Sequence, residues 1–136
     1  MDEPNSERGR DPEGMAAVRG VRGAITVMPD PMDLEPATAE LLDLMLASND
    51  VAPGDVAAAI FTLDEDLMGL NPAAAARAHG WTDVPLLMVR EHGGDARVGR
   101  CLRVLLLVNT TRAQSQIRHV YLRDAAGLRP DLPLTR

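Results

Sequence analysis

Apolar and polar positions alternate along residues 18–27 (VRGVRGAITV), with the period of two that is typical of a β-strand. One face of this strand carries Val18, Gly20, Arg22, Ala24 and Thr26. Arg22 therefore shares a face with small residues. This arrangement leaves room beside its guanidinium group, either for a ligand or for solvent.

Helical spacing follows a break at residues 28–31 (MPDP). Asp33 can cap a helix that ends near residue 49, and the apolar residues that recur along it are Leu34, Ala37, Leu41, Leu42 and Met45. A second helix of about two turns is predicted after Asn71, a favourable N-cap. Pro72 suits its first turn and Gly80 suits its C-terminal end.

Apolar runs predict three further strands at residues 56–63, 84–89 and 101–108, and a short strand within residues 117–122. Because helices and strands alternate, we expect a mixed α/β sheet with helices covering one face. The domain spans residues 16–136. Residues 1–15 carry proline, glycine and charge without apolar periodicity, and are predicted to be a flexible tail.

Composition narrows the class of protein. A chain of 136 residues is about one domain, and no stretch approaches the roughly 18 apolar residues that a membrane span needs. With no signal pattern at the N-terminus, we expect a cytoplasmic protein. The net charge of −6 argues against non-specific nucleic-acid binding. The single cysteine, Cys101, excludes an internal disulfide and is expected to be a small buried hydrophobe.

All 14 basic residues are arginine, through coding bias or through a need for bidentate carboxylate binding. Position singles out Arg103, because it interrupts an otherwise apolar strand where an unpaired charge is costly. It either forms an ion pair with Glu91 or points into a cleft completed by an anionic ligand. Considered alone, Glu91 is a solvated carboxylate at a strand end, Tyr121 a packing residue and His119 a structural histidine.

Three consecutive carboxylates at residues 64–66 suggest a metal site, but no histidine or fourth ligand is spaced to join them. We therefore interpret this stretch as a solvated loop and expect no metal.

The opening VRGVRGAITV, the strand around Arg103 and the closing IRHVYLRDAAGLRPDL together resemble the monofunctional chorismate mutases of the trimeric α/β (pseudo-α/β-barrel) class. The resemblance covers about residues 17–134 and includes PAAAAR at residues 72–77, Gly80-Trp81, and VPLLMVRE ending in Glu91. It implies the rearrangement of chorismate to prephenate without a cofactor.

The resemblance also implies roles for individual residues. Arg22 matches the arginine that holds a substrate carboxylate, and Arg103 the one that meets the breaking ether oxygen. Glu91 matches the acceptor for the ring hydroxyl, and Tyr121 a tyrosine lining the same pocket. Further positions expected to contact or cover the substrate are Arg77, Asn71, Ala73, Met88, Leu128 and Arg129.

The chain departs from the family pattern at three of its positions. Asn71 replaces an aromatic residue, Ala74 stands where a lysine can occur, and Met88 stands where a cysteine can occur. The resemblance implies a homotrimer with sites between subunits. Two alternatives stay open: a non-catalytic anion-binding or regulatory trimer, and an imine-hydrolysing deaminase on a similar scaffold.

Overall fold

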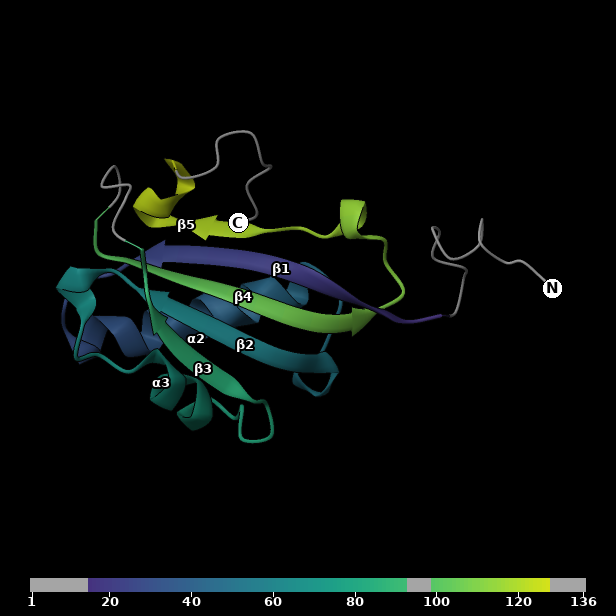
Figure 1. Ribbon diagram of the computed structural model, residues 1–136, viewed down its shortest axis with the longest axis horizontal. Coiled ribbons are helices and arrows are strands. Elements are labelled where there is room, and N and C mark those ends of the chain that lie inside the picture. Colours follow the sequence, from purple (N-terminus) through teal and green to yellow (C-terminus); the bar gives the residue numbers. More distant parts are fainter. Residues whose placement is uncertain (1–14, 93–98, 128–136) are drawn as a thin grey trace.

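A mixed β-sheet with two helices packed against one face makes up the described part of the chain, residues 15–92 and 99–127 of a computed structural model (Figure 1). The strands are β1 (Ala17–Thr26), β2 (Val56–Leu63), β3 (Leu86–Arg90), β4 (Cys101–Thr110) and β5 (Val120–Leu122). The helices are α2 (Pro31–Ala47) and α3 (Pro72–Ala78). The predicted fold class is confirmed, whereas the predicted tail lies outside the described residues except for Met15.

The sheet order is β3-β2-β4-β1-β5. The two central strands, β1 and β4, pair antiparallel along their full length, from Ala17 opposite Thr110 to Thr26 opposite Cys101. β2 joins the other side of β4, also antiparallel, while β3 and β5 add to the two edges as parallel partners. The centre of the sheet is therefore held by two long ladders, and short strands complete its edges.

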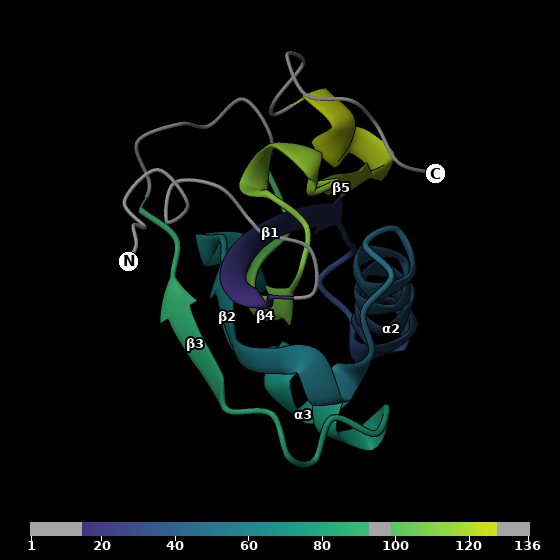
Figure 2. The ribbon, with the colours of Figure 1, turned by 90° about the vertical axis from the view of Figure 1, so that its right-hand side faces the viewer.

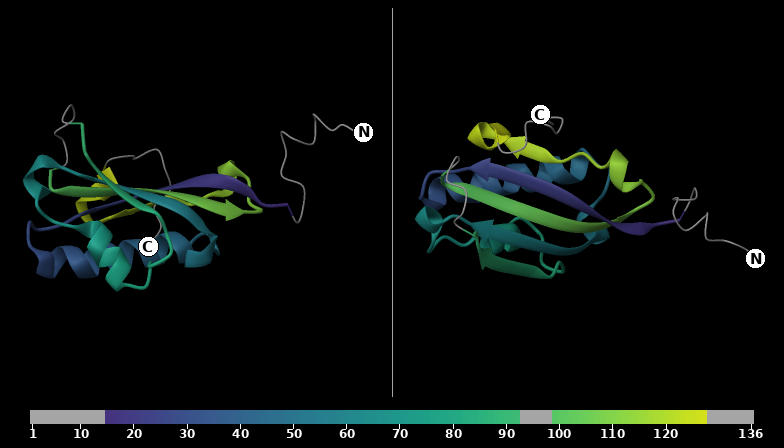
Figure 3. Two further views of the ribbon diagram at one scale, coloured as in Figure 1. Left: turned by 60° about the horizontal axis from the view of Figure 1, so that its bottom comes forward. Right: turned by 45° about the horizontal axis from the view of Figure 1, so that its top comes forward.

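Helices α2 and α3 cover the same face of the sheet (Figures 2 and 3). Alternate residues of β4 point toward them and are at most 3% exposed, namely Leu102, Val104, Leu106 and Val108. The helix side contributes the predicted residues Leu34, Ala37, Leu41, Leu42 and Met45, each at most 1% exposed. Each large side chain buried in this way contributes about 1.5–3 kcal/mol to folding.

Gly23 allows α2 to lie close to β1. A Cβ atom at this position would overlap with the side chain of Met45, which is fully buried in the core. The glycine that precedes Ala24 is thus required by packing on the helix side of the sheet.

Some predicted boundaries move by a few residues for local reasons. The N-cap of α2 is Asp30, whose side chain accepts the N–H of Met32, so the prediction that Asp33 caps this helix was wrong. Strand β3 begins at Leu86 because Pro85 has no N–H for the ladder, although its carbonyl accepts the N–H of Ala59. The N-cap role of Asn71 is confirmed, with its side chain accepting the N–H of Ala74.

Neither α2 nor α3 covers the opposite face of the sheet, as Figure 3 shows. It carries exposed apolar side chains on three strands: Val18 at 55%, Leu87 at 57% and Leu105 at 37% exposure. We call this the open face. No helix within the described ranges is long and apolar enough to cross a membrane.

Candidate active site on the open face

Arg103 lies at the middle of the open face. In the register of the sheet it is opposite Ala24 of β1 on one side and Thr62 of β2 on the other, and Ala24 is in turn beside Tyr121 of β5. Neighbouring residues in register project to the same face. Tyr121, Ala24, Arg103 and Thr62 therefore form a row across four strands.

Glu91 reaches this row from the end of β3. Its backbone N–H continues the ladder by donating to the carbonyl of Leu63, at 2.9 Å. Its carboxylate oxygen Oε1 accepts a hydrogen bond of 2.5 Å from the hydroxyl of Thr62 and lies 3.4 Å from Nε of Arg103. The ion pair that the sequence suggested is present.

This ion pair leaves Arg103 only partly satisfied. Its Nε atom is buried and makes no hydrogen bond of acceptable geometry within the described part of the chain, although Glu91 is in ion-pair range. The side chains of Arg103 and Glu91 are 27% and 25% exposed. Unmet donors on a guanidinium group beside a half-buried carboxylate can receive an anionic or oxygen-rich ligand.

Arg22 projects from β1 onto the same face, as the alternation predicted. It is opposite Leu105, two positions along β4 from Arg103. Such diagonal neighbours have Cα atoms about 7–8 Å apart, which long side chains can bridge. Arg22 is exposed. Two guanidinium groups that face solvent from adjacent strands suit a ligand with two separated negative charges.

Tyr121 closes the other end of the row. It is 5% exposed and packs in a small cluster with Ala24, Cys101 and Ala125, which lies on the open side of the sheet. Burial raises the pKa of the Cys101 thiol to about 12, so this cysteine is a protonated packing residue, as expected.

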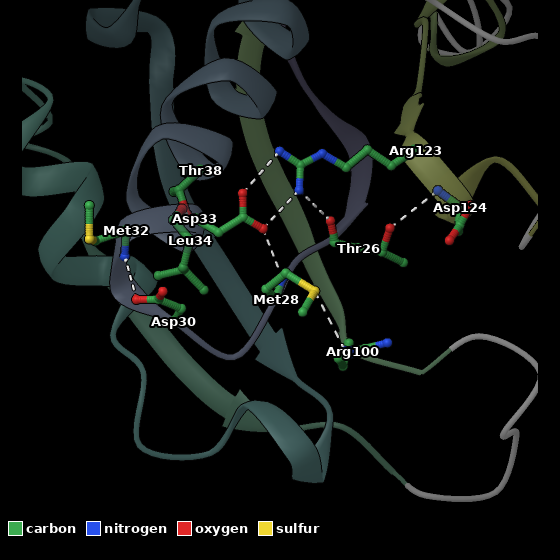
Figure 4. A network of polar contacts seen from close by, with 10 residues as sticks. All are labelled: Thr26, Met28, Asp30, Met32, Asp33, Leu34, Thr38, Arg100, Arg123 and Asp124. Atoms are coloured by element: carbon green, nitrogen blue, oxygen red, sulfur yellow. Dashed lines mark hydrogen bonds and ion pairs between the residues drawn. The ribbon is translucent and has the colours of Figure 1, made fainter.

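The chain after Tyr121 is anchored to the end of β1 (Figure 4). Arg123 donates to the carbonyl of Thr26 at 2.9 Å and to the carboxylate of Asp33 at 3.0 Å. The hydrogen bond from the N–H of Met28 and then that from Arg123 hold the pKa of Asp33 below its usual value. Asp33 thus ties the start of α2 to the segment that follows β5. A cavity of about 220 Å³ lies beside this network, and none of the predicted site residues that the structure describes is in its lining.

A second group of predicted residues lies on and beside α3, and the single chain does not bring it to Arg103. Arg77 is exposed in the last turn of α3, and Met88 is 40% exposed on edge strand β3. Ala73 is 6% exposed and belongs to the hydrophobic core, while Asn71 uses its side-chain oxygen to cap the helix. The predicted contacts Leu128 and Arg129 lie outside the described residues.

Two of the three acidic residues before α3 accept hydrogen bonds from the start of β4. Asp64 accepts the N–H of Cys101 at 2.9 Å and Asp66 accepts that of Arg100 at 3.2 Å. Burial raises the pKa of Asp64. Glu65 and Asp66 are exposed, as the solvated-loop interpretation requires, but Asp64 is half-buried. Among residues 15–92 and 99–127, no three His, Cys, Asp or Glu side chains are grouped to hold a metal ion.

Thr62 also belongs to this site, although the sequence pattern did not single it out. The hydroxyl group interrupts the apolar run of residues 56–63, which is the same signal that identified Arg103 in its own strand. Its pairing with Glu91 depends on the parallel register of β2 and β3, and a single sequence does not reveal that register.

Comparisons with known proteins converge on one family. Residues 18–132 match the family model described as chorismate mutase type I. The chain is 50% identical over 117 residues to chorismate mutase AroH of Thermus thermophilus, covering 85% of this chain and 96% of that protein. It is 38% identical over 121 residues to chorismate mutase AroH of Bacillus subtilis (strain 168), with 88% and 95% covered. A solved chorismate mutase from Clostridium thermocellum superposes with a TM-score of 0.74 at 36% identity, covering 78% of this chain and 96% of that one.

Proposed function

Because the chain belongs to the type I chorismate mutase family and is a chorismate mutase, an isomerase that converts chorismate to prephenate, we propose that the residues of the open face catalyse this reaction. The family assignment removes the basis for the imine deaminase alternative. The enzyme serves aromatic amino acid biosynthesis, and we place it in the cytoplasm.

The reaction is an intramolecular rearrangement in which one C–O bond breaks while one C–C bond forms. It needs no nucleophile and no cofactor. A protein can accelerate it by holding the flexible substrate in its compact reactive geometry and by placing positive charge where the ether oxygen becomes negative. Arginine suits both tasks because it stays protonated and binds carboxylates with two donors.

Arg103 is the residue that stabilises the ether oxygen. The Nε atom of its guanidinium group is buried and incompletely bonded, and Glu91 fixes one side of the group. A donor that is already held in place stabilises negative charge that develops beside it, because it does not have to reorganise first. The unmet hydrogen-bonding capacity of Arg103 is the single observation that carries this assignment.

The neighbouring residues hold the substrate around that point. Arg22 binds a substrate carboxylate from the adjacent strand, and Glu91 accepts the ring hydroxyl with its second carboxylate oxygen, because Thr62 and Arg103 both contact Oε1. Tyr121 lines the pocket beside Ala24 and helps to bind the side-chain carboxylate.

A homotrimer completes the site. The open-face residues and the group on and beside α3 are separate in one chain, and exposed Leu87, Leu105 and Val18 leave an apolar surface that a neighbouring subunit can cover. In the trimer, Arg77, Asn71, Ala73 and Met88 of a neighbouring subunit lie at the rim.

The assay that tests these roles follows the loss of chorismate absorbance with the wild type and Arg103→Ala. We expect the variant to lose at least about 10²–10³-fold in kcat, the scale for removing one preorganised donor to a developing oxyanion. Arg90→Ala is the matched control, because Arg90 is an exposed arginine at the end of β3. A near-normal rate for Arg103→Ala would show that another arginine has this role.

Mixing subunits tests the assembly. Sedimentation gives the mass of the oligomer, and co-refolding Arg103→Ala with Arg77→Ala should restore activity above the mean of the two separate variants if each site takes these arginines from different subunits. No restoration in a confirmed mixed trimer would show that both arginines act within one chain or at separate sites.

A further inference from the structure

Side chains make hydrogen bonds to the edge of β1 that faces β5, at the positions of β1 that β5 does not reach. Backbone pairing with β5 covers only Gly23, Ala24 and Ile25. Before that point, the N–H of Arg22 donates to Nδ1 of His119 at 2.9 Å. A side chain thus replaces, at Arg22, the hydrogen bond that a longer β5 would make. Arg22 is also a proposed substrate-binding residue.

Gln114 continues the same edge at Gly20. Its side-chain amide accepts the N–H of Gly20 at 2.9 Å and donates to the carbonyl of Gly20 at 2.7 Å. The two backbone groups are satisfied as a paired strand would satisfy them. Side chains from residues 114–119 therefore keep β1 bonded on both edges from Gly20 to Ile25.

His119 is itself held in place from the helix layer. Asn49, which is 0% exposed, accepts the N–H of Arg118 at 2.7 Å and donates to its carbonyl at 2.9 Å. A further bond to the carbonyl of Met45, at 2.8 Å, fixes the Asn49 amide. The N–H and the carbonyl of Arg118, the residue before His119, are thus both bonded to a buried side chain. The backbone that carries the imidazole ring is therefore held in place.

We propose that His119 is a positioning residue for the reaction, holding the backbone of Arg22 through Nδ1 so that the Arg22 guanidinium meets the substrate carboxylate. The inference rests on the proposed role of Arg22. A backbone shift at Arg22 is passed to the end of a long side chain, and a displacement of about 1 Å in an active site can cost about 10²-fold in rate. Accepting an N–H requires a lone pair on Nδ1, which the neutral ring with its proton on Nε2 supplies.

Two substitutions at this position separate the hydrogen bond from the packing. His119→Phe keeps a ring and removes the acceptor, and we expect kcat/KM for chorismate to fall by roughly 10–100-fold. His119→Asn places a carbonyl oxygen close to the position of Nδ1 and should restore most of the activity. Gln114→Leu is the control on the same edge: it removes two hydrogen bonds from Gly20, which has no side chain to aim, and should change kcat/KM little.

A double-mutant cycle shows whether His119 acts through Arg22. In an Arg22→Ala background there is no guanidinium group to aim, so adding His119→Phe should have no further effect on kcat/KM. A purely structural role would lower kcat/KM by the same factor in both backgrounds.

The outcomes distinguish this inference from the proposed function. Normal activity in His119→Phe, equal losses in the Phe and Asn variants, or a fully additive cycle would overturn the role of His119 alone. A wild-type rate in Arg22→Ala would overturn the role of Arg22, and with it the positioning role. If His119→Phe does not fold, the comparison moves to His119→Asn and His119→Gln. The glutamine carbonyl lies one bond farther out, so equal activity in these two would overturn the inference.

Discussion

Replacing Thr62 by valine removes one hydroxyl group from the site and almost nothing else. The two side chains have the same branched shape, and the register that puts Thr62 beside Arg103 is made by the backbone. The lost interaction is the 2.5 Å hydrogen bond to Oε1 of Glu91, the same oxygen that lies 3.4 Å from Nε of Arg103. In the wild type, Thr62 and Arg103 both hold the Glu91 carboxylate, and the substitution leaves only Arg103 to hold it.

The size of the effect follows from the burial of the partners. Hydrogen bonds to charged groups contribute about 1.5–3 kcal/mol when they are buried. Glu91 is 25% exposed, so water can replace part of this interaction, and we take about 1 kcal/mol as the net loss. If the loss appears as poorer placement of Glu91 in the transition state, kcat/KM falls about 5-fold, because 1.36 kcal/mol corresponds to tenfold.

The measurement is steady-state loss of chorismate with Thr62→Val, and Thr62→Ser as the matched control. Serine keeps the hydroxyl and removes the methyl group, so it should retain more activity than valine. If valine matches the wild type, or if serine is as slow as valine, the hydroxyl does not position Glu91 and the reasoning is wrong.

Three further predictions concern the packing and the titrating groups. Gly23→Ala places a methyl group against Met45 and should lower the free energy of unfolding by about 1–3 kcal/mol in chemical denaturation; an unchanged midpoint would mean that the helix moves away without strain. Asp33 has a lowered pKa in the folded state, so its carboxylate stabilises the fold above the unfolded pKa and this contribution is lost as pH falls through the folded value. Asp33→Asn should therefore be less stable than wild type near pH 7 and closer to it near pH 3, and a constant difference across this range would contradict the assignment. The thiol of Cys101, buried and with its pKa raised to about 12, should resist a disulfide reagent at pH 8 until denaturant unfolds the chain; rapid reaction of the native protein would refute its burial.

The sequence alone predicted what depends on periodicity. The alternation in β1 placed Arg22 on one face of the strand with Gly20 and Ala24, and the interruption of an apolar strand identified Arg103. Both inferences use only the spacing of residues within one element, and both agree with the structure.

What the sequence could not supply depends on contacts between elements. The bond from Arg22 to His119 joins residues 97 positions apart, so His119 by itself had the pattern of an ordinary structural histidine. Asp30 and Asp33 are equally good capping residues from sequence alone. In the folded chain, Asp30 caps α2, whereas Asp33 pairs with Arg123. The roles of Leu128 and Arg129 stay predictions.

The alternation along β4 gives the two faces of the strand separate roles. Its even-numbered residues from Leu102 to Val108 build the core, and its odd-numbered residues lie on the open face, where Arg103 serves the site and Leu105 belongs to the apolar surface. The effect of a substitution in β4 therefore depends on the face of the sheet to which the residue points. A change at Arg103 alters the chemistry first, while changes at the even positions alter folding first. Variation on the open face beside Arg103 can thus change the site without rebuilding the core on the helix side.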